Sequence, residues 1–249
     1  MKPVKIEFQR DPAWEFIDPI IPASQAIPNW YKEAQAYKTE AAIHDKTGMT
    51  FKACPAILDS MLQGYILPLW ADVWVSPSED GIAPVFTWAE GVDRGEADLP
   101  LVTWQGSPEV SKGFHHFDAM SSAPSTLKLN SPWLVKTPEG YSILTMPPLN
   151  NRDSRFEAVS GVVCSDVFTT YINIPLIWKA PPDYEGLIKQ GTPLIQIMPF
   201  KREIFQQELS LTTNDGGDLS TREKACARKI GSVFRGGYRK FFQKTVVSK

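Results

Sequence analysis

Residues 132–200 decide the fold of this chain. They read Pro132-Trp-Leu-Val-Lys-Thr-Pro-Glu-Gly-Tyr-Ser-Ile-Leu144, then Gly161-Val-Val-Cys-Ser-Asp166, then Ile172-Asn-Ile-Pro-Leu-Ile177, and last Lys189-Gln-Gly-Thr-Pro-Leu-Ile-Gln-Ile-Met-Pro-Phe200. Short apolar runs alternate with Pro, Gly and Asn, which is typical of strands joined by tight corners. The pattern therefore predicts an all-β core in this part of the chain.

The elements expected before this core are short. Alternating apolar residues predict an opening strand over residues 1–10, and residues 28–38 predict a short helix that begins with a proline. Pro55 opens a further helical stretch, and Gly64 suits the position just after its end. An apolar strand interrupted at Pro68 follows.

The domain organisation follows from the remaining segments. Residues 76–125 predict two or three short strands, and residues 209–219 are the best candidate for a linker. Ser220-Thr-Arg-Glu223 fits a capping box and predicts a helix of about ten residues. We expect a β-rich core domain over residues 1–208 and a basic helical tail over residues 220–249. The fold class is mainly β, with a β-sandwich or jelly-roll-like core, short N-terminal helices and a C-terminal helical tail.

Composition fits a globular protein with an uneven charge. The chain has 249 residues, of which 43% are hydrophobic and 22% charged, and its 21 prolines favour loops, edges and corners over long helices. The net charge is −2, but residues 222–249 hold nine Lys or Arg and one Glu. The tail therefore carries +8 and the rest of the chain −10, an asymmetry that bears on association.

The cysteines and the N-terminus indicate a compartment. Cys54, Cys164 and Cys226 are odd in number and far apart, so a disulfide framework is not expected and a reducing interior is the simplest setting. We interpret them as small buried apolar residues. The first ten residues contain no apolar signal core, and no window approaches the ~20 apolar residues of a membrane helix. We expect a protein that is not Sec-exported and that contacts no membrane.

A candidate metal site lies at Phe114-His-His-Phe-Asp118. His116 and Asp118 match the first two ligands of the iron(II) facial triad found in 2-oxoglutarate oxygenases. Such an enzyme needs a later histidine, and none follows His116, because the remaining one is His44. The favoured interpretation is a strand end with a solvated Asp, so we expect no metal ion and no cofactor.

A second candidate is the pair Gly161-Val-Val-Cys-Ser-Asp166 and Gly191-Thr-Pro-Leu-Ile-Gln196. Over about 40 residues it resembles the last conserved stretches of trimeric dUTPases and dCTP deaminases. The resemblance implies a nucleotide site with Asp166 at the family's second Asp and Gln196 at its terminal Gln. Cys164 stands where that family has the Asp that deprotonates water, and a thiol is a poor carboxylate substitute. The alternative interpretation is that the glycines only shape turns.

A resemblance over most of the chain points elsewhere. The sequence is similar to an uncharacterised family of tailed-phage proteins, known mainly from cyanophages. The shared segments are Ile27–Lys32, Cys54–Asp59, Gly64–Leu69, Pro132–Ser142, Gly161–Asp166 and Lys189–Arg202. The resemblance implies a viral or prophage origin, a β-sandwich body and a location in the host cytoplasm or the virion. It brings no catalytic residues.

The tail is the third candidate. Its basic residues alternate with Phe and Tyr, and the partner-binding candidates among them are Arg228, Lys229, Arg235, Arg239 and Lys240. This mixture suits a helix packed on its own body, a helix docked on a protein partner, or phosphate contacts with base stacking. We expect a protein partner or self-association, with nucleic acid as the less favoured alternative.

These observations favour a phage-type binding or assembly protein without catalysis. The alternative is an enzyme on the same β core, either a dUTPase-like nucleotide pyrophosphatase or an iron(II) oxygenase. The enzyme needs a convergent polar pocket, whereas the binding protein needs an exposed apolar or charged patch.

Overall fold

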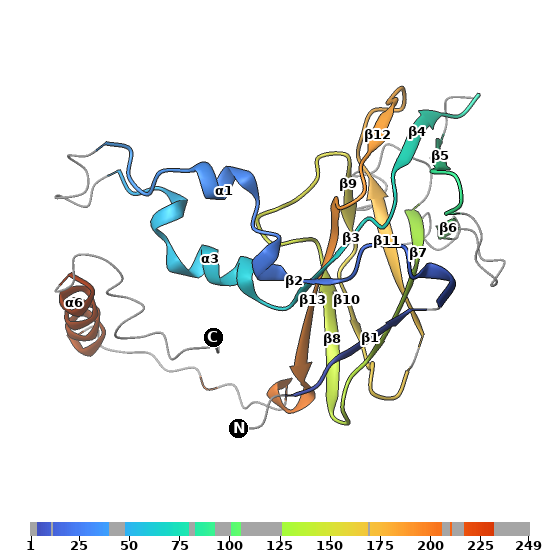
Figure 1. Ribbon diagram of the computed structural model, residues 1–249. Helices are drawn as coiled ribbons and strands as arrows, with labels where there is room; N and C mark the ends of the chain where they lie inside the picture. The colour runs from blue at the N-terminus through green and yellow to red at the C-terminus, as the bar shows by residue number, and fades with distance from the viewer. Residues whose placement is uncertain are drawn as a thin grey trace. The chain divides into compact units, whose positions relative to one another are not determined.

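The computed structural model describes residues 4–10, 12–39, 48–79, 83–92, 101–105, 126–168, 170–205, 210 and 217–231. The protein is mainly β and contains several antiparallel sheets, as the sequence predicts (Figure 1). The chain forms two compact units, one of Met1–Ala34 with Ser60–Phe205 and one of Gln35–Asp59 with Gln206–Lys249.

The first sheet has five strands, and β7 lies at its centre. They are β1 (Glu7–Arg10), β6 (Val102–Gln105), β7 (Thr126–Lys136), β9 (Phe156–Ala158) and β11 (Tyr171–Trp178). β7 pairs with β11 on one side and with both β1 and β6 on the other, and β9 pairs with the far side of β11. The 11 residues of β7 are long enough to serve two short partners end to end.

The second sheet also has five strands, in the order β10-β8-β13-β3-β2. They are β2 (Ile21–Pro22), β3 (Tyr65–Pro68), β8 (Tyr141–Met146), β10 (Gly161–Val163) and β13 (Pro193–Lys201). Figure 1 shows β8 and β13 running side by side at the centre of this sheet, where Gln196 pairs with Met146 and Lys201 with Tyr141. β10 lies at one edge and β2 at the other.

The third sheet has the order β12-β4-β5. Its strands are β4 (Val73–Pro77), β5 (Pro84–Trp88) and β12 (Gly186–Ile188). Along β4, buried Val73 and Val75 alternate with exposed Trp74. One face of this sheet is therefore buried and the other faces solvent, as alternation in an antiparallel sheet requires.

The chain crosses from the first sheet to the second between β9 and β10. Only Val159 and Ser160 separate these strands, and the Val159 N–H donates to the carbonyl of Pro175 in β11. β9 pairs within the first sheet and β10 within the second. One short segment thus links the two sheets covalently at their edges.

The inward residues of all three sheets pack in one hydrophobic cluster. It includes Leu127 of β7, Ile143 of β8, Val75 of β4 and the stacked rings of Trp70 and Trp88, whose centroids lie 5.5 Å apart. The three sheets therefore share a continuous core. Burying a single large side chain of this kind contributes about 1.5–3 kcal/mol.

The helices are short apart from α6. They are η1 (Pro12–Trp14), η2 (Ala23–Gln25), α1 (Asn29–Glu33), η3 (Phe51–Ala53), α3 (Pro55–Leu62), η4 (Arg202–Phe205) and α6 (Gly217–Gly231). α3 begins at Pro55 as expected, and Gly64 beyond its end has a φ of +70°. The Cβ of any other residue there would collide with the Ile197 carbonyl oxygen.

Two expected boundaries differ from the structure. The helix predicted over residues 28–38 ends at Glu33, because Ala34 is extended and the chain beyond it pairs with residues 48–50 through the Tyr37–Met49 bridge. The tail helix begins at Gly217, before the expected capping box. Residues 209–219 are thus not a linker throughout, since the helix already includes the last three of them. Within the described ranges, no helix combines the length and the apolar character that a membrane span requires.

Candidate functional site

The structure describes two of the three candidate sites in whole or in part. The Phe114–Asp118 segment lies outside the described residues, as do Arg235, Arg239 and Lys240 of the tail. The nucleotide-site candidates Asp166 and Gln196 are described, and so are Arg228 and Lys229. In the part of the chain that the structure covers, no group of three or more His, Cys, Asp or Glu is arranged to hold a metal ion.

Asp166 is bound to Arg202 at the end of β13. Its carboxylate Oδ1 accepts a hydrogen bond of 2.8 Å from Arg202 Nη1, and Oδ2 accepts one of 2.5 Å from Nη2. Oδ2 also accepts from the backbone N–H of Gly140 at 2.9 Å. The Asp166 side chain is only 2% exposed, whereas that of Arg202 is 37% exposed. This bidentate geometry is the strongest form of an Arg–carboxylate pair.

The surroundings of Asp166 explain its ionisation. The Arg202 hydrogen bonds are the main cause that holds the pKa of the Asp166 carboxyl well below its ordinary value, and they outweigh burial. Arg202 Nη1 also donates to the Tyr141 carbonyl at 2.8 Å and to Ser142 Oγ at 3.1 Å. The pair therefore ties the turn after β10 to β8 and to the end of β13. Its carboxylate is a stable anion engaged on both oxygens, which is unlike a general base poised near neutral pH.

Gln196 lies in the middle of β13 and is fully buried. Its Nε2 donates to the carbonyls of Ser60 at 3.0 Å and Gln63 at 2.6 Å, and its Oε1 accepts from Leu149 N–H at 2.9 Å. The last carbonyls of a helix lack intrahelical partners, and α3 ends at Leu62. Gln196 therefore caps the end of α3 and uses both of its amide hydrogens to do so.

Asp166 and Gln196 thus have separate structural partners. Asp166 bonds with residues of the β7–β8 turn and η4, whereas Gln196 bonds with the end of α3 and the loop after β8. The two side chains share none of these partners. The arrangement supports the interpretation that this segment shapes the fold.

The cysteines differ from expectation. Cys54, Cys164 and Cys226 are free thiols, and all three are exposed. The interpretation as buried apolar residues is therefore wrong. Cys164 lies directly after β10 and Cys226 lies on α6, and both are exposed, so hydrophobic burial is not the reason for a thiol at either place.

Sequence reasoning missed a second ion pair, which is partly buried, at Asp153 and Arg155. Asp153 Oδ2 lies 2.7 Å from Arg155 Nη2, and Arg155 Nη1 donates to the Leu187 carbonyl of β12 at 3.2 Å. Burial raises the pKa of the Asp153 carboxyl, but the hydrogen bonds of Arg155 outweigh burial and leave that pKa below its ordinary value. The Asp-Ser-Arg spacing was the only available signal, and it does not identify Leu187 as a partner.

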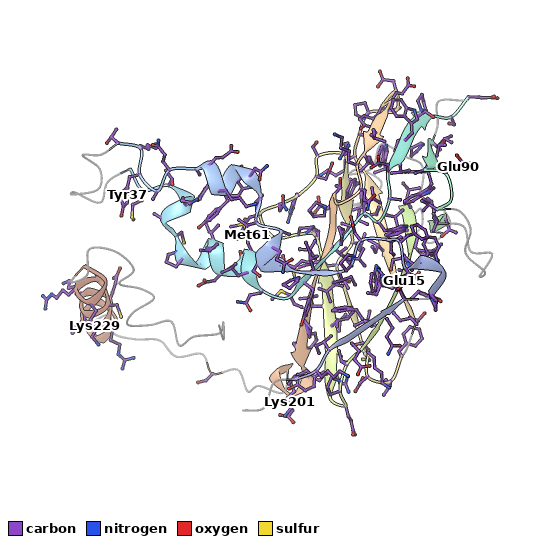
Figure 2. All side chains as sticks on the ribbon, in the orientation of Figure 1. Glu15, Tyr37, Met61, Glu90, Lys201 and Lys229 are labelled. Atoms are coloured by element: carbon purple, nitrogen blue, oxygen red, sulfur yellow. The ribbon has the colours of Figure 1, made fainter. Side chains whose placement is uncertain are left out.

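The basic tail residues are exposed where they are described. Arg228 and Lys229 lie in the last turn of α6, where positive charge is favourable next to the negative end of the helix dipole. Figure 2 shows the labelled Lys229 side chain projecting from the helix. Exposure at a helix end does not by itself identify a binding site.

An exposed apolar face on the third sheet is one surface that the sequence did not predict. Trp74, Val85 and Leu187 are 44%, 45% and 39% exposed on the outer face of the third sheet. Trp74 on the central strand pairs with Leu187 on one side and Thr87 on the other. We call Trp74, Val85 and Leu187 the Trp74 face. The sequence shows that the side chains of residues 73–75 alternate between the two faces of a strand, but it does not show which of these faces is buried.

A small cavity lies between the first and third sheets. Its volume is about 20 Å³, and apolar side chains line it, among them Leu69, Leu129 and Trp178. The cavity is large enough for about one water molecule, but its apolar lining offers no hydrogen-bond partner, so the cavity stays dry. Among the described residues, the buried indole Nε1 of Trp70 also lacks a hydrogen-bond partner. Neither feature forms a substrate pocket, which typically measures about 300–1,000 Å³.

No protein-family model matches the sequence, and no curated protein matches it either.

Proposed function

We propose that this chain is a phage-type binding or assembly protein without catalysis, and that the Trp74 face binds a protein partner. The observation that carries the proposal is an exposed tryptophan at the centre of a solvent-facing sheet, with Leu187 paired to it on β12 and Val85 diagonal to it on β5. Tryptophan is enriched among residues that dominate binding energy, and clustered exposed apolar side chains mark interaction surfaces.

The fold supports this role as a scaffold. We infer a β-sandwich or jelly-roll-like core, because the inward residues of the first and second sheets join one cluster and the β9–β10 segment passes between their edges. Such a core holds the third sheet through Val73, Val75 and Ile188, which are all buried. The Trp74 face is therefore presented on rigid strands, a support that favours a defined interface.

Charge around the Trp74 face indicates what the partner looks like. Asp183 and Glu185 just before β12 and Lys189 just after it are all exposed. A partner that fits this surface has an apolar centre and a rim that carries both signs of charge, since opposite charges at a rim steer association and exclude wrong partners. A second, weaker contact through the basic tail residues Arg228 and Lys229 suits an acidic site on the same or another partner.

The experiment is mass spectrometry of purified particles from the virus or prophage that carries the gene. We expect the chain in the particles at a fixed ratio to the other proteins. Trp74→Ala should weaken its incorporation by at least roughly thirtyfold, equivalent to a loss of about 2 kcal/mol. Trp30→Ala is the matched control, because Trp30 is a tryptophan of equal exposure outside the Trp74 face.

Two results would overturn this proposal. One is a protein absent from particles or incorporated normally after Trp74→Ala. The other is pyrophosphate release from dUTP or dCTP with magnesium that Asp166→Ala abolishes in a folded variant. The second result would favour the nucleotide pyrophosphatase instead.

A further inference from the structure

The edge strand β10 is a surface independent of the Trp74 face. β10 pairs with β8 on one side, and no other described strand pairs with it. Natural proteins protect such edges with charged side chains, proline or bulges. Residues 159–165, Val-Ser-Gly-Val-Val-Cys-Ser, contain no charge and no proline, so this edge lacks those devices.

Exposed apolar side chains gather on the same short segment. Val162 of β10 is 57% exposed, and Val167 and Phe168 in the turn that follows are 78% and 60% exposed. Cys164 between them is exposed as well. Val163 points the other way and packs against the core. A backbone edge that no described strand pairs and an apolar side-chain surface therefore occur together within residues 162–168.

The charge of this edge indicates its occupant. Asp166 is the only charged residue between Val159 and Tyr171, and its buried carboxylate is neutralised by Arg202. The full chain carries a net charge of only −2, and this edge adds no net charge to it. A neutral apolar edge is self-complementary under a two-fold axis, because no like charges meet across it.

We propose that β10 pairs with β10 of a second copy, antiparallel about a two-fold axis, to form a homodimer whose second sheet continues across the interface. Val162 packs against its own counterpart as a cross-strand pair. Val167 and Phe168 of each copy cover the apolar surface of the other. Because each copy contributes only three paired residues to the ladder, the dimer is weak, with a Kd in the micromolar range, as befits a small interface.

Sedimentation equilibrium of the full chain between about 1 and 200 µM tests the proposal. We expect the mass to rise from the 27.9 kDa monomer toward twice that value. Val162→Lys adds a charge at the two-fold axis and should raise the Kd at least roughly tenfold, because like charges directly opposite one another destabilise a strand pair. Val4→Lys is the matched control, since Val4 is an exposed valine outside both surfaces, and it should leave the Kd unchanged.

A disulfide cross-link between the two copies tests the register of the β10–β10 pairing. This test does not depend on whether the Val162→Lys variant folds. In a pairing centred on Val162, residue 164 lies opposite residue 160 of the second copy. The variant Cys54→Ser, Cys226→Ser, Ser160→Cys leaves Cys164 and one new thiol across the interface, within the ~4.4–6.8 Å Cα separation that a disulfide needs. Mild oxidation should give a covalent dimer in high yield, whereas the same variant with Ser160 restored should not.

The proposal is overturned by a monomer at every concentration, by a dimer whose Kd both lysine variants change equally, or by failure of the 160–164 cross-link in a protein that dimerises. A dimer lost on Val162→Lys while particle incorporation persists would support the dimer and show that it is separate from binding through the Trp74 face.

Discussion

The Asp166 carboxylate binds the Arg202 guanidinium through two parallel hydrogen bonds, across 36 residues of sequence. The pair links the turn after β10 to the end of β13, and Gly140 N–H adds a third bond to the same carboxylate. These contacts make Asp166 a structural anion of the second sheet.

Asp166→Asn should lower the melting temperature by several degrees at pH 7, because it removes the charge that Arg202 binds. Folding lowers the pKa of Asp166 below its ordinary value of 3.8. The pair's contribution is therefore complete above about pH 5 and is lost as the pH falls below about 4 toward the folded-state pKa. Thermal unfolding of both proteins between about pH 2 and pH 7 checks this, and the difference between them should shrink in acid.

The control for this measurement is Glu203→Gln. Glu203 pairs with Lys201, but their side chains are 70% and 47% exposed, so the change should have little effect at any pH. A constant difference between wild type and Asp166→Asn across the pH range would contradict the prediction.

Gln196→Leu should destabilise the protein by about 3 kcal/mol, although leucine fits the volume. The change leaves the Ser60 and Gln63 carbonyls and the Leu149 N–H without the bonds that Gln196 supplies, and each such buried group costs about 1–3 kcal/mol. Urea denaturation measures the effect. Gln190→Leu is the control, since Gln190 makes an exposed bond to Asp18, and it should change stability by less than about 0.5 kcal/mol.

Gly64→Ala should cost more than Gly191→Ala. Both glycines have positive φ, at +70° and +82°, so both changes carry the backbone cost of about 1 kcal/mol. Only at Gly64 does the new Cβ also meet the Ile197 carbonyl oxygen, whereas nothing lies within 4 Å at Gly191. Denaturation curves of the two variants isolate the steric part, and equal destabilisation would show that the backbone at Gly64 moves freely.

All three thiols should react in the folded protein. Cys54, Cys164 and Cys226 are exposed and free, so titration with a thiol reagent such as DTNB should count three groups without denaturant. Single Cys→Ser variants should each remove one. A buried class that reacts only after unfolding would contradict the structure.

Deletion of residues 222–249 distinguishes a tail that binds an acidic partner from a tail that packs on its own body. We expect the remaining chain to keep its melting temperature and to lose a salt-sensitive association with an acidic polypeptide, for which polyglutamate is a probe. The variant Arg228→Glu, Lys229→Glu keeps the aromatic residues and should weaken the same association. If the deletion alone lowers the melting temperature, the tail packs on its own body instead.

Local signals in the sequence identified the strands, because turn residues act on their immediate neighbours. Gly64 was expected to follow a helix and does so with positive φ, and the break at Pro68 separates β3 from β4. The sequence did not show that these two strands belong to different sheets, since alternation tells which residues face a core but not which strands pair.

The candidate site was less predictable for the same reason. The sequence singled out Asp166 and Gln196 through a family resemblance, but their partners Arg202 and Ser60 are 36 and 136 residues away. Only tertiary structure shows that these polar groups are engaged. The exposure of Trp74 was equally hidden, because an apolar residue in a strand normally faces inward.

The pairing of Ile66 in β3 with Gln196 in β13 has a consequence for biosynthesis. Translation at about 5–20 residues per second leaves β3 outside the ribosome for roughly 10 s before its partner emerges. The apolar Tyr65-Ile-Leu-Pro segment must stay unaggregated during that interval. The second sheet therefore closes only near the end of synthesis, when β13 becomes available to both β3 and β8.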